Sequence, residues 1–207
     1  MKPGTQPSAK GTLVLGAVVA VRRLRDKGRI SAEQLEARLA APAVALLDQK
    51  INIAGWYPIQ AFTDLMDVNW EVAGRRDPEF MRREGARSAD RLFESKIYQQ
   101  LDFAQQAARV QTREQMLRQS RLITSITHSL YNFLEIEVRM AGPRQDELQI
   151  TYANAAAFSE ALRYSTEGFM NEINKRQKSS RVWISERAAQ DRILFRMPVP
   201  SHLTEPA

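Results

Sequence analysis

The last third of this 207-residue chain alternates apolar and polar residues as a β-strand does, whereas the residues before it follow the period of a helix. Two pairs of alternating segments, each joined by a polar turn sequence, predict two β-hairpins: residues 134–140 with 148–152, and residues 182–185 with 193–197. Residues 155–175, between the hairpins, have helical spacing. Helices followed by strand pair, helix and strand pair predict an α+β fold with an antiparallel sheet made of two C-terminal hairpins.

Several start and stop signals divide the region before the hairpins into helices. Ser31 with Gln34 is a capping-box pattern, which predicts a helix to about residue 39. Pro42 favours the start of a second helix. Residues 56–58 read as a turn into a third helix, which we expect Gly74 to end in a left-handed conformation.

Two further helices follow, and one apolar run precedes them all. Asp77 and Pro78 predict the start of a fourth helix, and residues 96–130 have the pattern of a long helical stretch. Residues 12–21 form the most apolar run, which is about half the length of a membrane span and is followed by arginines. A buried strand or a short core helix is therefore expected there, with no membrane span.

Composition sets the domain organisation and the compartment. Residues 1–10 and 199–207 are rich in proline and lack periodicity, so we expect a disordered tail at the start, a single α+β domain over residues 11–198, and a flexible tail at the end. The chain has no cysteine, which rules out disulfides and thiolate sites and suits a cytoplasmic protein.

The sequence contains no assembled catalytic motif. It lacks metal-ligand spacing, a glycine-rich phosphate loop and a nucleophile elbow, so we expect no enzyme activity, no metal and no cofactor. Its two histidines are His128 and His202. We expect His128, beside Leu130 and Tyr131 near a helix end, to be a partly buried structural residue, with a haem or ligand contact as the alternative.

Two groups of residues are candidates for a ligand- or partner-binding site. Arg83, Arg87 and Arg91 recur every four residues and so form one stripe of a helix, which is either an anion or partner site or a salt-bridged surface. The aromatic residues Trp56, Tyr57 and Phe62 either pack in the core or line a site for an apolar ligand or a dimer contact.

The net charge of +6 leaves a second class of function open. Two further basic clusters lie at residues 22–29 and 175–181. A basic nucleic-acid-associated protein is the alternative hypothesis, although neither cluster is interleaved with aromatic residues or adjoins a helix-turn-helix.

The order of elements from residue 134 to 199, with Gly168-Phe169 in the helix and a terminal ILFRMPV strand, resembles the vinyl-reductase-type small-molecule-binding domain. That domain shares its fold with haem–nitric-oxide-binding-like proteins and TRAPP subunits. Residues 55–58 and the segments 83–86 and 98–101 also resemble a myxobacterial paralogous family of unknown function.

The resemblance implies ligand sensing or protein scaffolding, often as a homodimer. Zinc-binding members use cysteines, which this chain lacks, and haem-binding members use a Tyr-x-Ser-x-Arg motif, which Tyr164-Ser165-Thr166 does not match. We therefore expect a non-catalytic cytosolic sensor or adaptor domain without zinc or haem, which binds a small apolar or anionic ligand or a protein partner.

Overall fold

The predicted antiparallel sheet is present in a computed structural model that describes residues 6–94, 113–176 and 179–199. Its four strands lie in the order β3-β4-β6-β5, and every neighbouring pair is antiparallel. The strands are β3 (Glu135–Ala141), β4 (Glu147–Ala153), β5 (Ile184–Ala189) and β6 (Arg192–Pro198). The prediction of an α+β fold with two C-terminal hairpins separated by a helix is confirmed.

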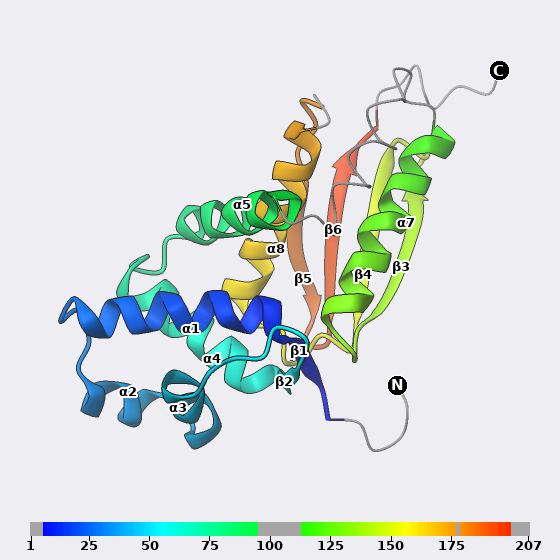
Figure 1. Ribbon diagram of the computed structural model, residues 1–207. Coiled ribbons are helices and arrows are strands. Elements are labelled where there is room, and N and C mark those ends of the chain that lie inside the picture. The colour runs from blue at the N-terminus through cyan, green and yellow to red at the C-terminus, as the bar shows by residue number, and fades with distance from the viewer. Residues whose placement is uncertain (1–5, 95–112, 177–178, 200–207) are drawn as a thin grey trace.

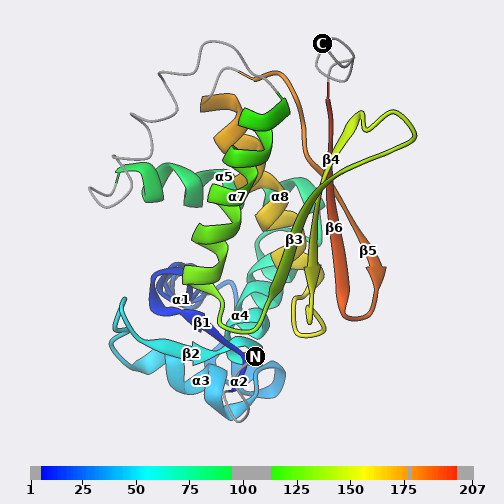
Figure 2. The ribbon, with the colours of Figure 1, turned by 90° about the vertical axis from the view of Figure 1, so that its right-hand side faces the viewer.

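In the described chain, helices cover one face of this sheet. Helix α7 (Arg113–Leu130) packs beside β3, and α8 (Glu160–Arg176) packs beside β5 (Figures 1 and 2). The side chains under them are fully buried, with Leu148, Ile150 and Phe195 at 0% exposure. The opposite face carries charged residues such as Glu186 and Arg196, which bond each other at 2.6 Å. The alternation predicted from the sequence is therefore the division between core and solvent.

The N-terminal helices follow their predicted signals. They are α1 (Gly11–Asp26), α2 (Ala32–Arg38), α3 (Ala41–Asp48) and α4 (Ile59–Val72). Both halves of the capping box form at the start of α2, where the Gln34 amide donates to Ser31 and the Ser31 amide donates to Gln34. Pro42 lies in the first turn of α3. The apolar run at residues 12–21 is part of helix α1, which was one of its two expected forms.

Three details differ from the sequence-based expectations. Residues 56–58 form strand β2 (Trp56–Pro58), because they pair with β1 (Ser8–Lys10), so the expected N-terminal tail is ordered from Ser8. Val199 is likewise buried, and its amide donates to Asp146. Gly74 is not left-handed, because Arg75 and Arg76 take that conformation with φ of 51° and 58°. Gly74 instead leaves room for Phe80, whose ring would lie 2.5 Å from an added Cβ.

Helix α5 (Pro78–Glu94) crosses α8 at very short range. A Cβ added to Gly85 would lie 1.8 Å from the carbonyl oxygen of Ser165, and one added to Gly168 would lie 2.0 Å from that of Arg82. Two glycines thus allow the two helix backbones to touch. The crossing fixes α8, and with it one edge of the sheet, against the N-terminal helices.

The predicted long helix over residues 96–130 is present from Arg113 onwards, and its earlier part lies outside the described residues. Within the described ranges, no helix is long and apolar enough to cross a membrane.

Candidate functional site

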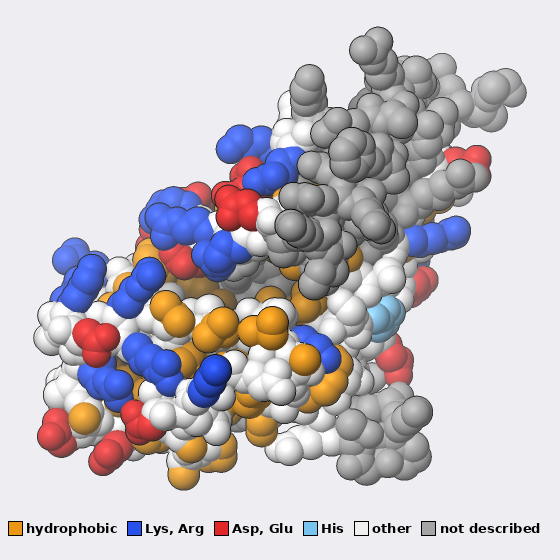
Figure 3. Space-filling view, viewed as in Figure 1, with side chains coloured by type: hydrophobic (Ala, Val, Ile, Leu, Met, Phe, Trp, Pro, Cys, Tyr) orange, Lys and Arg blue, Asp and Glu red, His pale blue; other side chains and the backbone are white. Residues whose placement is uncertain are grey.

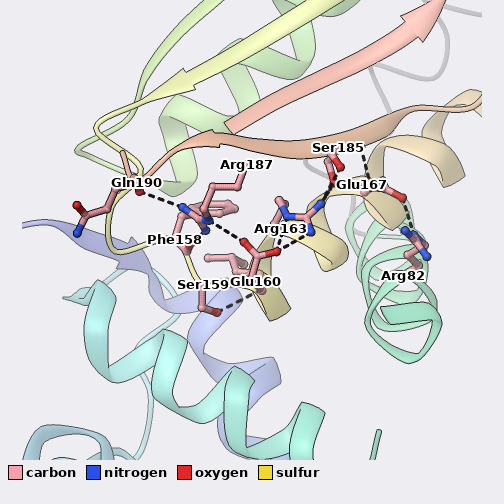
Figure 4. A network of polar contacts seen from close by, with 10 residues as sticks. Arg82, Phe158, Ser159, Glu160, Arg163, Glu167, Ser185, Arg187 and Gln190 are labelled. Atoms are coloured by element: carbon pink, nitrogen blue, oxygen red, sulfur yellow. Dashed lines mark hydrogen bonds and ion pairs between the residues drawn. The ribbon is translucent and has the colours of Figure 1, made fainter. Parts of the chain in front are cut away.

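A buried polar network starts from one stripe of helix α8 (Figure 4). Its members recur every three or four residues, so they share one face of the helix, and we call them the α8 polar stripe: Glu160, Arg163, Glu167, Asn171 and Asn174. Three of them are nearly inaccessible to solvent, with Arg163, Glu167 and Asn174 at 6%, 4% and 6% exposure. Charged residues are almost never buried to this extent unless they are paired.

The stripe bonds the backbone of alternate residues along the free edge of β5. The amide of Trp183 donates to Oδ1 of Asn171 at 2.6 Å, and Nδ2 of Asn171 donates to the Trp183 carbonyl at 3.1 Å. The amide of Ser185 donates to Oε2 of Glu167 at 2.8 Å, and Arg163 donates to the Ser185 carbonyl at 2.7 Å. These are the bonds that a neighbouring strand would make, so helix side chains take the place of a fifth strand.

The spacing of the α8 polar stripe matches the spacing of alternate residues in β5, because one turn of helix and two residues of strand rise by similar distances. Four helical residues rise about 6 Å, and two strand residues rise about 6.6 Å. Each step along the stripe therefore meets the next inward-facing residue of the strand. Asn174 extends the same contact to the carbonyl of Arg181 at 3.1 Å.

The other end of the stripe holds the last part of β5 through ion pairs (Figure 4). Glu160 accepts from Arg163 at 2.5 Å and from Arg187 at 2.7 Å, and Arg187 also bonds the carbonyl of Phe158. Burial opposes ionisation of Glu160, but the bonds from the two arginines outweigh it and hold its pKa below the usual value.

Glu167 connects the contact between the α8 polar stripe and β5 to helix α5. Its Oε1 accepts from Nε of Arg82 at 2.5 Å, while its Oε2 accepts from the amide and hydroxyl of Ser185. Figure 4 shows the carboxylate between the two. One buried side chain thus joins α5, α8 and β5, next to the glycine crossing.

Just before β5, two donors have no oxygen acceptor among the described residues. The indole Nε1 of Trp183 is buried and has no hydrogen-bond partner. Arg181, two residues earlier, directs Nη1 to the sulfur of Met116 at 2.9 Å, and within the described residues no ion pair joins it to a carboxylate. Burial alone lowers the pKa of Arg181. Trp183 Nε1 shares this condition with Arg196 Nε among the described residues, and unsatisfied buried donors are uncommon in folded proteins.

A second polar group of interest is Asp67 on α4. It borders an open pocket of about 340 Å³, which is lined by Arg38, Asp64, Asp67, Val68 and Glu71. Burial raises the pKa of Asp67 to about 6, although a hydrogen bond from Ser159 favours its ionised form. Asp64, Glu160 and Arg76 act on it more weakly. The side chain links α4 to the turn before α8.

We expect the substitution Asp67→Asn to stabilise the protein at pH 7.5. The pKa of Asp67 is about 6 in the fold and 3.8 in the unfolded chain, so the folded state binds more protons between these limits. Proton binding to Asp67 therefore stabilises the folded state fully below pH 4, and this stabilisation is lost as the pH rises through 6. The gain is about 1 kcal/mol after allowance for partial exposure, and it should vanish near pH 4.

Urea denaturation of both proteins at pH 4 and 7.5 measures this difference. Asp48→Asn is the matched control, because that carboxylate is 72% exposed and pairs only with Arg25 at 3.3 Å. A gain of equal size at both pH values would show that Asp67 is not protonated as proposed.

The candidate residues named from the sequence do not form one cluster. Trp56 is 44% exposed with Nζ of Lys10 4.5 Å from its ring centroid, whereas Phe62 is 3% exposed in the core. Tyr57 is half-buried, and its hydroxyl accepts from the amide of Asn52 at 2.8 Å. Phe62 therefore packs as a core residue, and the role of Trp56 and Tyr57 in binding stays a prediction.

The predicted arginine stripe lies on the exposed face of α5. Arg87 pairs with Glu84, Arg83 lies 3.8 Å from Asp77, and Arg91 donates to the hydroxyl of Ser88 at 2.7 Å. Figure 3 shows lysine and arginine side chains gathered over α1 and α5, with carboxylates among them. Two of the three arginines thus have local acidic partners, and a binding role for the stripe stays a prediction.

The expectation for His128 was wrong. The side chain is exposed on α7, because the preceding residue, Thr127, is the one that faces the sheet. The Thr127 hydroxyl lies 3.2 Å from that of Tyr152, whose pKa burial raises to about 12. Within the described residues, no group of three histidine or acidic side chains is placed to hold a metal ion.

No family model matches the sequence, and no curated protein matches it. Solved structures do match the fold over nearly the whole chain. The Fe(II) unliganded H-NOX protein from K. algicida has a TM-score of 0.60 at 14% identity, covering 93% of this chain and 97% of that one. An H-NOX variant from T. tengcongensis has a TM-score of 0.52 at 14% identity, covering 91% and 96%. The chain has the fold of H-NOX domains.

The side chains of this H-NOX fold do not fit haem. None of its five tyrosines begins a Tyr-x-Ser-x-Arg motif, and Tyr152, at the end of β4, is followed by Asn154 and Ala156 at those positions. His128 points to solvent. Tyr131 and Tyr152 pack against Phe158 with ring centroids 5.5 and 5.9 Å apart, so these aromatic side chains form one cluster beside the end of α7.

The α8 polar stripe was not among the sequence-based predictions, which rested on the apolar side of that helix. A usable signal was present. Five polar residues share one face of a helix that lies between two strand pairs, and a helix in that position must bury a face against the sheet. The pairing of that stripe with alternate residues of β5 could not be read from the sequence.

Proposed function

We propose that this chain is a non-catalytic, cytosolic sensor or adaptor domain with the H-NOX fold, which acts without haem and associates as a homodimer. It binds a small anionic molecule or a protein partner. The H-NOX fold supports a sensor role, and the misfit of its side chains to haem supports a different ligand. The further resemblance to vinyl-reductase-type domains and to the myxobacterial family stays a prediction.

The observation that carries the proposal is the pair of donors just before β5. Arg181 and the indole of Trp183 direct N–H groups inward without an oxygen acceptor among the described residues. A carboxylate or phosphate is the class of ligand that accepts from donors of this kind, and an anion beside Arg181 would raise its pKa back toward the usual value. The charged groups beside them offer no acid–base pair to a substrate, because the α8 polar stripe bonds the fold itself.

We expect protein purified from its own source to retain a small anionic molecule and no haem. Native mass spectrometry gives the adduct mass, and an absorption spectrum detects haem independently. Arg181→Leu should lose the adduct because it removes the cationic donor. Arg144→Leu, in the exposed turn between β3 and β4, is the matched control and should keep it. A haem adduct, or an adduct that survives Arg181→Leu, would contradict the proposal.

A further inference from the structure

The sheet has one closed edge, at β5, and one open edge, at β3. The open edge can pair with a strand of another chain. The edge at β5 is closed by the α8 polar stripe and is further broken by a register shift between Arg187 and Ala189. The edge at β3 has no such protection. In Figure 2 this edge faces the viewer, and no described helix crosses in front of it. An open edge with apolar residues is a template for another strand.

Alternate residues of β4 direct their backbone groups to β6 and to β3, and this alternation shows which backbone groups of β3 have no partner strand. Val199 donates its amide to Asp146 at 2.8 Å, and Pro198, which has no amide hydrogen, lies opposite Glu147. Even-numbered residues of β4 therefore bond β6, and odd-numbered residues bond β3. Because Glu137 is paired with Thr151, the odd residues of β3 bond β4 in turn.

The even residues of β3 consequently direct their backbone groups to the free edge. These residues are Ile136, Val138 and Met140, and no hydrogen bond in the described chain occupies that side of them. Their side chains lie on the inner face and are only half-buried beside α7. The edge thus offers both unpaired backbone groups and apolar surface that a further strand would cover.

The charges on the outer face of β3 favour pairing with a second copy of the same strand. Glu137 and Arg139 are exposed, and neither forms an ion pair within the described residues, although Arg139 donates to Gln149 at 3.3 Å. In an antiparallel pairing with Val138 opposite the partner's Val138, Glu137 lies opposite the partner's Arg139. The same register places Ile136 opposite the partner's Met140.

Neighbouring registers are disfavoured. A shift by two residues in either direction keeps the backbone phase but places Glu137 opposite the partner's Glu137, or Arg139 opposite the partner's Arg139. Like charges directly opposite each other destabilise a strand pair, whereas opposite charges stabilise it. The register with Glu137 opposite the partner's Glu137 would also place Glu135 opposite the partner's Arg139. Only the register centred on Val138 combines open backbone groups, apolar pairs and matched charges without like charges directly opposite, and it has the twofold symmetry of a homodimer.

We propose that two copies of this chain pair through β3 in this register and join their sheets into one. The inference rests on the homodimer of the proposed function and identifies its surface. It is independent of the ligand at Arg181, because β3 and β5 lie at opposite edges of the sheet.

Cysteine cross-linking tests the register directly, because the natural chain has no cysteine. Residues opposite each other in a non-hydrogen-bonded pair have Cα atoms about 4.5 Å apart, which suits a disulfide. We expect a mixture of Glu137→Cys and Arg139→Cys chains of different mass to form the mixed disulfide dimer on mild oxidation. Either variant alone should stay largely uncrosslinked.

Self-cross-linking of Glu137→Cys or of Arg139→Cys would instead indicate a shifted register and overturn the proposed one. Sedimentation velocity of charge variants gives a second readout. Glu137→Arg should weaken the dimer about tenfold or more, because it creates two Arg–Arg contacts. Adding Arg139→Glu to the same chain should restore it.

The outcomes separate the two proposals. A dimer that responds to none of the β3 variants contradicts this surface and leaves the homodimer standing. A chain that is monomeric at all concentrations contradicts both the surface and the homodimer, and the anionic ligand is then judged by its own test.

Discussion

Gly168→Ala is expected to lower the free energy of unfolding by about 3 kcal/mol, at the upper end of the usual cost of overpacking. The added Cβ would lie 2.0 Å from the carbonyl oxygen and 2.6 Å from the Cα of Arg82. These are backbone atoms of α5, so no side chain can rotate away, and the two helices must separate. Separation would also lengthen the contact between Arg82 and Glu167, which lies at the same crossing.

Urea denaturation followed by circular dichroism measures this loss, and Gly16→Ala is the matched control. Gly16 lies on the exposed face of α1, and the nearest atom to its added Cβ is a terminal nitrogen of Arg91 at 4.0 Å. Alanine should stabilise that helix by about 0.5–1 kcal/mol, because glycine has the lower helix propensity. If both substitutions changed stability in the same direction, the close crossing of α5 and α8 would be incorrect.

Glu167→Leu is expected to cost about 3 kcal/mol, because it removes the acceptor for three donors at once. Arg82 would keep its longer ion pair with Glu79 at 3.5 Å but lose the contact with Glu167. The amide of Ser185 would be left buried without an acceptor, and its hydroxyl would keep the bond that it accepts from Arg163 at 2.8 Å. Breaking a buried ion pair by removing one partner typically costs 3–5 kcal/mol. The lower value applies here, because the Arg82 side chain is 33% exposed and can still reach water.

Glu167→Gln should lose less, about 1–2 kcal/mol, because the amide oxygen can still accept one of these bonds. The control is Glu186→Gln, which removes the charge from an exposed pair with Arg196 and should change stability by less than about 0.5 kcal/mol. Equal effects of Glu167→Leu and Glu186→Gln would show that Glu167 does not join α5 to β5.

The alternation of apolar residues predicted the sheet, because an inner face under helices and an outer face in water demand period two. The capping box at Ser31 and the proline at residue 42 predicted helix starts for equally local reasons. Gly74 was misassigned because its role depends on Phe80, which contacts it across a turn. A long-range contact of this kind leaves no periodic signal.

The candidate site was less accessible to sequence reasoning. Charge spacing located the exposed arginines of α5 and placed Glu84 within reach on the same helix, but the pairing of Arg83 with Asp77, before the helix, was not predicted. Burial decided the role of the other polar residues. Arg163 and Glu167 look like surface residues in the sequence, yet they are buried because β5 lies against α8 and its edge supplies their partners.

The most direct test of the two unequal edges is amide hydrogen exchange, resolved by NMR in dilute protein and again at high concentration. We expect the amides of Trp183 and Ser185 to be protected at both concentrations, because α8 side chains bond them. The amide of Val138 should exchange quickly in the dilute monomer and become protected as chains pair. Rapid exchange at Trp183 and Ser185, or protection of Val138 in the monomer, would contradict a sheet that is closed at β5 and open at β3.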